Sequence, residues 1–213
     1  MSIEKPNTQG IHLYSHSDDF RSHWIRYMLA EKQVAYQLIF SDYDDEDVQD
    51  LSPYHSLPIL LEQNVKLYHC ASIAEYIDDR YRQHKLYADH PAQRAEQRQY
   101  IWRLESDWFH LLHDLQRQHD AQHAFKQETL QHFSHTLIAL TPLFQHFPYF
   151  LSEQFSILDC VFAPILLRLK AYHVDLPQPH CRPILQYAQR IFQRTAFRQS
   201  LTLQEQNRYQ SYL

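Results

Sequence analysis

The stretch "LPILLEQNVKLYHCASIAEYIDDRY", residues 57–81, decides the fold. Two short apolar runs, 57–61 and 65–69, are close enough in sequence to pair as a hairpin, and a helical pattern follows over 72–81. The apolar residues at helical spacing are Ile73, Tyr76 and Ile77. The stretch therefore predicts two paired strands that lead directly into a helix, with His69 and Cys70 at the turn.

The residues upstream predict a βαβ unit. A β-like run at 11–15 is followed by "SHWIRYMLAEK" (22–32), in which Trp24, Ile25, Met28 and Leu29 recur at helical spacing. The next apolar residues, Val34, Tyr36, Leu38 and Phe40, alternate with period two, as in a strand. The acidic segment 42–51 supplies a short helix or loop. The order βαβαββα fits a small mixed sheet flanked by helices.

From Pro91 onward the pattern is helical only. One stripe contains Ile101, Leu104, Trp108, Leu111, Leu112 and Leu115, and amphipathic stretches follow near 125–146 and 157–171. Ser156 and Asp159, three residues apart before an apolar run, form a capping pattern that starts a helix. We expect an α/β domain over 10–83, a polar linker over 84–90 and an all-α domain over 91–213.

Composition excludes several classes of protein. The formal net charge of −5 gives no general attraction to nucleic acid or to an acidic membrane. No apolar run is long enough to span a bilayer and the first ten residues do not resemble a signal peptide, so we expect a cytoplasmic protein. Cys70, Cys160 and Cys181 are odd in number and far apart, as expected for reduced thiols.

Neither a metal site nor a nucleotide cofactor is predicted. Most of the sixteen histidines stand alone, and the pairs His110/His113 and His132/His135 lack carboxylates in ligand register. Gly10 is the only glycine, which excludes the glycine-rich loops that hold phosphates and the GxSxG turn of hydrolases. We therefore expect no cofactor.

Together these segments resemble the glutathione transferase fold, a thioredoxin-like domain followed by a helical domain. The likeness covers nearly the whole chain and rests on "VAYQLIFSD" (34–42), on Leu57-Pro58-Ile59, on "SIAEYIDDR" (72–80) and on "FSILDCVFAP" (155–164). Within that superfamily the chain resembles the stringent starvation protein A group, which associates with RNA polymerase. "YSHSDDFRSHWIRYMLAEK" (14–32), "WRLESDW" (102–108) and "YFLSEQFSILDCVFAP" (149–164) carry this closer likeness.

The resemblance also locates the catalytic position, and Asp19 occupies it. Related transferases place a Ser, Cys or Tyr there, whose donor favours ionisation of the glutathione thiol. An ionised carboxylate only accepts hydrogen bonds, and it repels a thiolate. Ser15, Ser17 and Ser22 lie nearby and would substitute only in a rebuilt turn. The resemblance therefore implies a protein without transferase activity.

The His69-Cys70 pair stands where the family usually has Glu-Ser, which binds the γ-glutamyl end of glutathione. A hydrogen bond to a charged group contributes about 1.5–3 kcal/mol, so this replacement should weaken glutathione binding about ten- to a thousandfold. Pro58 matches the family's cis-proline, which can persist as architecture. Two alternatives to a lost site are a metal ligand pair completed by distant residues and a reactive Cys70 thiol at a helix N-terminus.

Three functions follow from these residues. The resemblance favours a non-catalytic regulator of the stress response that binds RNA polymerase holoenzyme with its sigma factor as a homodimer, without reading DNA sequence directly. The alternatives are a glutathione transferase or thiol-handling enzyme with a rebuilt site, and a binding module for another small ligand. A glutathione-resin pull-down distinguishes the enzyme from the others.

The expected partner-binding segment is Arg82-Gln83-His84-Lys85. It aligns with a proline-rich surface pocket around a histidine in the polymerase-binding relatives, but here the prolines are missing and the histidine comes one residue later. Arg82 and Lys85 can still pair with acidic surfaces of polymerase or sigma factor. The competing interpretation is a solvated helix end, where cations are favourable.

Overall fold

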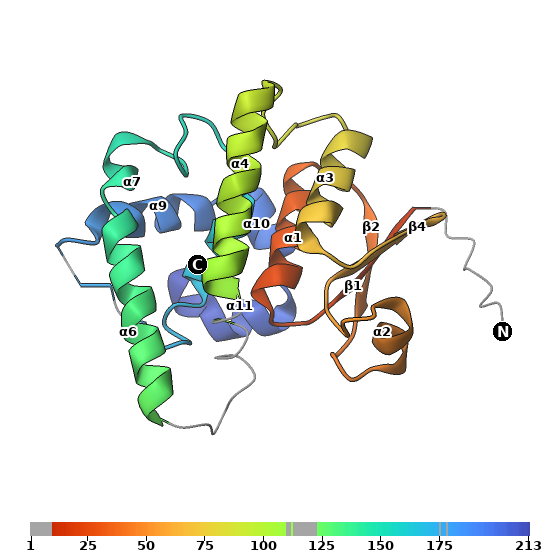
Figure 1. The fold of residues 1–213 in the computed structure, drawn as a ribbon, viewed down its shortest axis with the longest axis horizontal. Helices are drawn as coiled ribbons and strands as arrows, with labels where there is room; N and C mark the ends of the chain where they lie inside the picture. The colour runs from red at the N-terminus through yellow and green to blue at the C-terminus, as the bar shows by residue number, and fades with distance from the viewer. Residues whose placement is uncertain (1–9, 110–111, 113–122, 175, 178) are drawn as a thin grey trace. The chain divides into compact units, whose positions relative to one another are not determined.

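The computed structural model describes residues 10–109, 112, 123–174, 176–177 and 179–213. These residues group into two compact units. The first contains the chain up to Lys85 together with Arg194–Ser211, and the second contains Leu86–Gln193. Figure 1 shows the strands gathered in the N-terminal part, whereas the part that follows is helical.

The first unit confirms the predicted βαβαββα order. Its N-terminal elements are β1 (Ile11–Ser15), α1 (Phe20–Glu31), β2 (Tyr36–Phe40), α2 (Glu46–Leu51), β3 (Ile59–Glu62), β4 (Val65–Leu67) and α3 (Cys70–Arg80). The strands form one sheet in the order β2-β1-β3-β4. β1 is parallel to β2 and antiparallel to β3, and β3 and β4 form the hairpin.

The two faces of this sheet have different partners. Val48 of α2 packs with Ile59 and Leu61 of β3 in one buried cluster, which Tyr14 of β1 also contacts. Leu60 alternates with these residues and is fully buried on the opposite face, as is Leu13, which pairs with it. The mixed sheet is therefore covered on both faces, as the glutathione transferase resemblance implies.

Helix α1 is buried more completely than a single apolar stripe predicts. Every residue from Trp24 to Leu29 is buried, including Arg26. The opposite holds at the end of β2, where Phe40 is 57% exposed although the period-two pattern placed it with Tyr36 and Leu38. Periodicity identified both elements, but it did not indicate what else packs against them.

The second unit is helical, and α8 is buried along its whole length. Its elements are α4 (Pro91–Leu104), a π-helical turn (Glu105–Phe109), α6 (His123–Leu140), α7 (Leu143–His146), α8 (Ile157–Leu167) and α9 (Arg182–Phe192). Ser156 and Asp159 form a capping box at α8, in which Asp159 Oδ2 accepts the Ser156 N–H at 2.8 Å. Asp159 Oδ1 accepts from Phe150 N–H and from the Tyr187 hydroxyl.

Aromatic side chains fill the core of the second unit. Trp108 packs edge-on against Phe133 and tilted against Phe162. Of the stripe predicted over 101–115, Ile101, Leu104, Trp108 and Leu112 are buried, whereas Leu111 and Leu115 lie outside the described residues. No helix of the described chain is both long and apolar enough to cross a membrane.

The C-terminal segment contains α10 (Thr195–Ser200), α11 (Leu203–Tyr209) and a 3-10 turn (Gln210–Tyr212). The division expected from the sequence assigned all of 91–213 to the helical domain. Packing instead groups Arg194–Ser211 with the N-terminal residues, and α10 lies against α1. The first unit is thus assembled from two parts of the chain that are distant in sequence.

Candidate functional site

Asp19 caps α1. Its backbone is extended, and its Oδ2 accepts the Ser22 N–H at 2.8 Å. The side chain is fully buried. Asp19, which the resemblance predicted at the thiol-activating position, is therefore a carboxylate that accepts a backbone hydrogen bond and fixes the start of a helix.

The three serines near Asp19 all use their hydroxyl groups within the chain. Ser15 Oγ accepts from Arg26 Nη1 at 2.5 Å and donates to the His16 carbonyl. Ser22 Oγ accepts the His16 N–H at 3.1 Å, and Ser17 Oγ donates to Gln204 Oε1 at 2.6 Å. To donate to a bound thiolate, the Ser15 or Ser17 hydroxyl would first have to leave its present acceptor, whereas Ser22 is fully buried.

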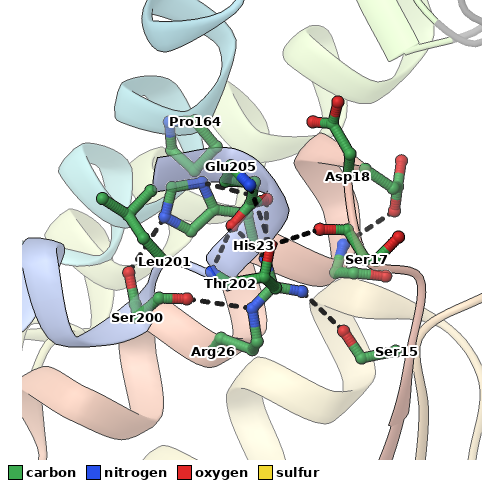
Figure 2. Close-up of polar contacts among 12 residues, drawn as sticks. Ser15, Ser17, Asp18, His23, Arg26, Pro164, Ser200, Leu201, Thr202 and Glu205 are labelled. Atoms are coloured by element: carbon green, nitrogen blue, oxygen red, sulfur yellow. Dashed lines mark hydrogen bonds and ion pairs between the residues drawn. The ribbon is translucent and has the colours of Figure 1, made fainter. Parts of the chain in front are cut away.

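A buried ion pair joins this region to the C-terminal segment. Arg26 Nη2 donates to both oxygens of Glu205 at 2.7 and 2.8 Å, and Arg26 Nε donates to the Ser200 carbonyl at 3.0 Å (Figure 2). Arg26 is 1% exposed and Glu205 is fully buried. Glu205 also accepts the Thr202 N–H as part of the capping box of α11.

His23 lies beside this ion pair, and its contacts indicate which ring nitrogen bonds to Ser200. Its Nε2 is 2.9 Å from Ser200 Oγ, whose own proton is donated to the Phe197 carbonyl at 2.6 Å (Figure 2). Nε2 must therefore carry the proton and donate it to Ser200. The other nitrogen, Nδ1, faces Glu205 Oε1 at 3.8 Å.

Helix α11 also contacts the turn that precedes α1. Thr202 Oγ1 donates to the Ser17 carbonyl at 2.7 Å. Asp18 accepts from Arg208 Nη1 at 2.5 Å and from the Tyr209 hydroxyl at 3.1 Å. The Ser17 carbonyl and the Asp18 carboxylate therefore already accept hydrogen bonds from within the chain.

The other residues that the resemblance predicted at a glutathione site, Pro58, His69 and Cys70, lie around β3 and β4. The Leu57–Pro58 peptide is cis. Leu57, the residue before it, packs in the same buried cluster that Tyr68, the residue before His69, contacts. The structure thus brings the Pro58 and His69-Cys70 segments together on one side of the sheet.

At the start of α3, His69 takes the N-cap position without capping the helix through its side chain. Its Nδ1 is 3.2 Å from Ser72 Oγ, and Cys70 is 5% exposed. Neither side chain supplies the carboxylate that would bind an ammonium group. Among the described residues no three His, Cys, Asp or Glu side chains gather as a metal site.

The segment Arg82–Lys85 follows α3 directly, and its four residues are exposed. His84 has a left-handed backbone with φ of 50°. The segment is held from beneath by Lys32, whose Nζ donates to the carbonyls of Gln83 and His84 at 3.1 and 3.2 Å. It is therefore not a simple frayed end of α3.

Sequence patterns did not identify Arg26, Lys32 or Glu205 as buried. A charged residue within a helical pattern is normally assigned to the solvent face, and their partners lie too far along the chain for any local pattern to reveal them. One signal was present for Glu205: it follows Thr202 by three residues, the spacing of a capping box.

Comparison with known proteins places this geometry in a family. Sequence models of the glutathione S-transferase N-terminal and C-terminal domains match residues 9–79 and 121–196. The stringent starvation protein A homolog of Pasteurella multocida is 35% identical, over 89% of this chain and 89% of that protein. The chain belongs to the stringent starvation protein A family. The Coxiella burnetii homolog is 32% identical, with 91% and 92% of the two chains covered.

Solved structures agree on the fold. The theta class glutathione S-transferase of Xanthomonas axonopodis pv. citri, with glutathione bound, has a TM-score of 0.79 at 19% identity and covers 91% of this chain and 98% of its own. Ure2p in complex with glutathione has a TM-score of 0.76 at 15% identity, with 92% and 94% covered. The predicted fold class and family resemblance are both confirmed.

Proposed function

We propose that this protein is a non-catalytic regulator of the stress response that acts in the cytoplasm by binding RNA polymerase holoenzyme. Membership of the stringent starvation protein A family supports this proposal. The observation that carries its non-catalytic part is the closed turn before α1, in which Asp19 caps the helix and Ser15, Ser17 and Ser22 bond within the chain.

The chemistry of the turn supports the absence of transferase activity. A glutathione thiolate needs a donor within about 3 Å of its sulfur, and the residue at the catalytic position only accepts. The ligand's γ-glutamyl end would also meet His69 and Cys70 in place of Glu and Ser. The proposal thus involves two losses, activation of the thiol at Asp19 and binding of the γ-glutamyl end at His69-Cys70. Restoring only one of them does not restore the reaction.

A conjugation assay tests this part of the proposal. The purified protein should not accelerate the reaction of glutathione with common electrophiles, and Asp19→Ser alone should not create activity. His69→Glu/Cys70→Ser should strengthen retention on glutathione resin about ten- to a thousandfold without turnover. Turnover by the wild-type protein clearly above the uncatalysed rate would instead establish the rebuilt-enzyme alternative.

We propose the exposed segment Arg82-Gln83-His84-Lys85 as the contact with the holoenzyme. Changing Arg82, His84 and Lys85 to Ala should leave the fold and assembly intact, because exposed substitutions rarely cost more than about 0.5 kcal/mol. Co-purification with polymerase should fall nonetheless, and wild-type binding should weaken with added salt as exposed charges are screened. Salt-insensitive binding that survives the triple change would move the contact elsewhere.

We also propose that the protein acts as a two-fold homodimer in which the thioredoxin-like domain of each subunit faces the helical domain of its partner. Two-fold homodimers are the commonest soluble assembly, and the family resemblance implies this arrangement. One chain has a mass of 25.8 kDa, and light scattering at micromolar concentration should give twice that value. A monomeric mass would contradict the dimer but leave the contact segment to be tested separately.

A hollow in the first unit favours one second candidate, the small-ligand module. It is an open surface hollow of about 700 Å³, and its lining residues are Ser17, Phe40, Thr202, Leu203, Gln204, Asn207 and Arg208. Phe40 and Leu203 are 57% and 73% exposed, an apolar surface beside polar groups. If the wild-type protein copurifies with no polymerase, ligand screening with Phe40→Ser as the control becomes the informative experiment.

A further inference from the structure

Lys32 is a fully buried lysine with three acceptors. Its Nζ donates to Asp78 Oδ1 at 2.7 Å, to the Gln83 carbonyl at 3.1 Å and to the His84 carbonyl at 3.2 Å. These acceptors match the three N–H groups of an ammonium. Asp78 is itself 1% exposed, so the ion pair is almost entirely removed from water.

The ion pair connects three parts of the first unit. Lys32 is the C-cap residue of α1, Asp78 lies in the last turns of α3, and the two carbonyls belong to the segment that follows α3. Taking an ammonium and a carboxylate out of water is costly, and replacing such a pair by apolar residues is often neutral or stabilising. Stability alone therefore does not explain why an ammonium is used here.

An ammonium does something that an apolar side chain cannot do: it fixes the positions of two consecutive carbonyls in an exposed segment. His84 has a φ of 50°, a left-handed conformation that non-glycine residues rarely adopt, and it lies between the Gln83 peptide and Lys85. The bond from Lys32 to the His84 carbonyl holds this conformation from the buried side. The outer side of the segment remains exposed.

A second buried charge fixes the residue just before the segment. The Tyr81 hydroxyl donates to Glu62 Oε1 at 2.7 Å, and Glu62 is 4% exposed. The backbone is thus anchored at Tyr81 and again at Gln83 and His84. The exposed side chains of Arg82–Lys85 are basic or neutral, since this segment contains no acidic residue.

We propose that the Lys32–Asp78 ion pair is a positioning device that shapes Arg82–Lys85 in advance into a basic surface for a carboxylate-bearing segment of the polymerase partner. This inference rests on the proposed function and assigns Lys32 and Asp78 a role in partner recognition without contact with the partner. Prolines stiffen a segment by fixing φ. Here a buried cation performs that task by fixing carbonyl groups.

The decisive variant removes the device without leaving an unpaired charge. Lys32→Met/Asp78→Leu replaces both members by apolar side chains, so neither charge is left buried without its partner, and the carbonyls of Gln83 and His84 lose their donor. The matched control is Glu31→Gln/Arg194→Gln, which disrupts a bidentate ion pair at 2.6 and 2.7 Å on the neighbouring residue of α1. That pair does not involve the 82–85 segment.

The measurement is the dissociation constant of each full-length variant for purified holoenzyme, beside its thermal midpoint and mass. A segment that adopts the binding shape a tenth of the time binds about tenfold more weakly. We expect Lys32→Met/Asp78→Leu to be folded with affinity reduced about tenfold or more, and the control to retain wild-type affinity. Amide relaxation of the free wild-type segment should give order parameters of about 0.85.

Each contrary result has a distinct meaning. A folded Lys32→Met/Asp78→Leu variant with wild-type affinity overturns the positioning role, even if the Arg82, His84 and Lys85 triple alanine variant loses binding and so supports the contact. Wild-type order parameters below about 0.6 overturn it without any variant. If the triple alanine variant still binds holoenzyme, both the contact at 82–85 and the positioning role of Lys32–Asp78 are overturned. If the wild-type protein does not bind holoenzyme, the proposed function is overturned as well.

Discussion

Glu62 shows how one buried carboxylate organises its neighbours. It ends β3, is 4% exposed and accepts hydrogen bonds from the hydroxyls of Tyr76 and Tyr81 at 2.7 Å each. Burial first, and then the hydrogen bond to Glu62, raises the pKa of each tyrosine to about 12. Both tyrosines therefore keep their protons well above the pH at which an ordinary tyrosine ionises.

These raised values predict a specific alkaline behaviour. A pKa above the unfolded value of about 10 contributes stability that is complete below pH 10 and lost between about pH 10 and 12. Glu62→Gln should lower both tyrosine pKa values, because it removes the negative charge while retaining an acceptor. Titration of tyrosine-labelled protein by NMR checks this, with Tyr76→Phe and Tyr81→Phe identifying the signals. Unchanged titration would leave burial as the sole cause.

At the scale of elements, sequence patterns predicted the strands and helices whose signals come from residues close together in the chain. Hydrophobic period and capping residues placed the strands, α3 and the start of α8 within a few residues, because those signals lie inside each element. The π-helical turn Glu105–Phe109 was read as part of a continuous helical stripe, because its apolar residues still recur at similar spacing. The return of α10 and α11 to the first unit could not be predicted, because no local pattern records a contact between residues 26 and 205.

The candidate site divides in the same way. Asp19, Pro58, His69 and Cys70 were assigned by likeness to a family, and their role as a degenerate glutathione site stays a prediction. Lys32 and Asp78 were not located, since each is an ordinary charged residue of a helix until the structure shows both at 0–1% exposure.

The buried Arg26–Glu205 ion pair connects α1 to α11, and it predicts a large loss of stability from one substitution. Glu205→Leu leaves the Arg26 guanidinium buried without its carboxylate and should lower the free energy of unfolding by about 3–5 kcal/mol. Thr202→Ala, which removes a cap, should cost about 1 kcal/mol, and the exposed Leu203→Ala at most about 0.5 kcal/mol. Urea unfolding measures all three. A loss below about 1 kcal/mol for Glu205→Leu would mean that water reaches Arg26.

At the scale of the whole molecule, the first unit depends on the far end of the sequence. Asp18, His23 and Arg26 are buried, and each bonds to a residue beyond 199. Residues 1–85 alone should therefore show no cooperative unfolding transition, although they contain the whole sheet. Adding a peptide of residues 194–213 should restore one, as followed by circular dichroism. Cooperative unfolding of 1–85 without the peptide would show that the C-terminal segment is dispensable.

The Arg26–Glu205 pair also has a consequence for biosynthesis. The two residues are 179 positions apart, so the ribosome adds Arg26 to the chain long before it adds Glu205. At about 5–20 residues per second, the delay is roughly 10–35 s. Throughout that interval the nascent sheet and α1 lack their final polar partners and expose an unfinished surface. The N-terminal unit, although made first, reaches its native state only after α11 has left the exit tunnel.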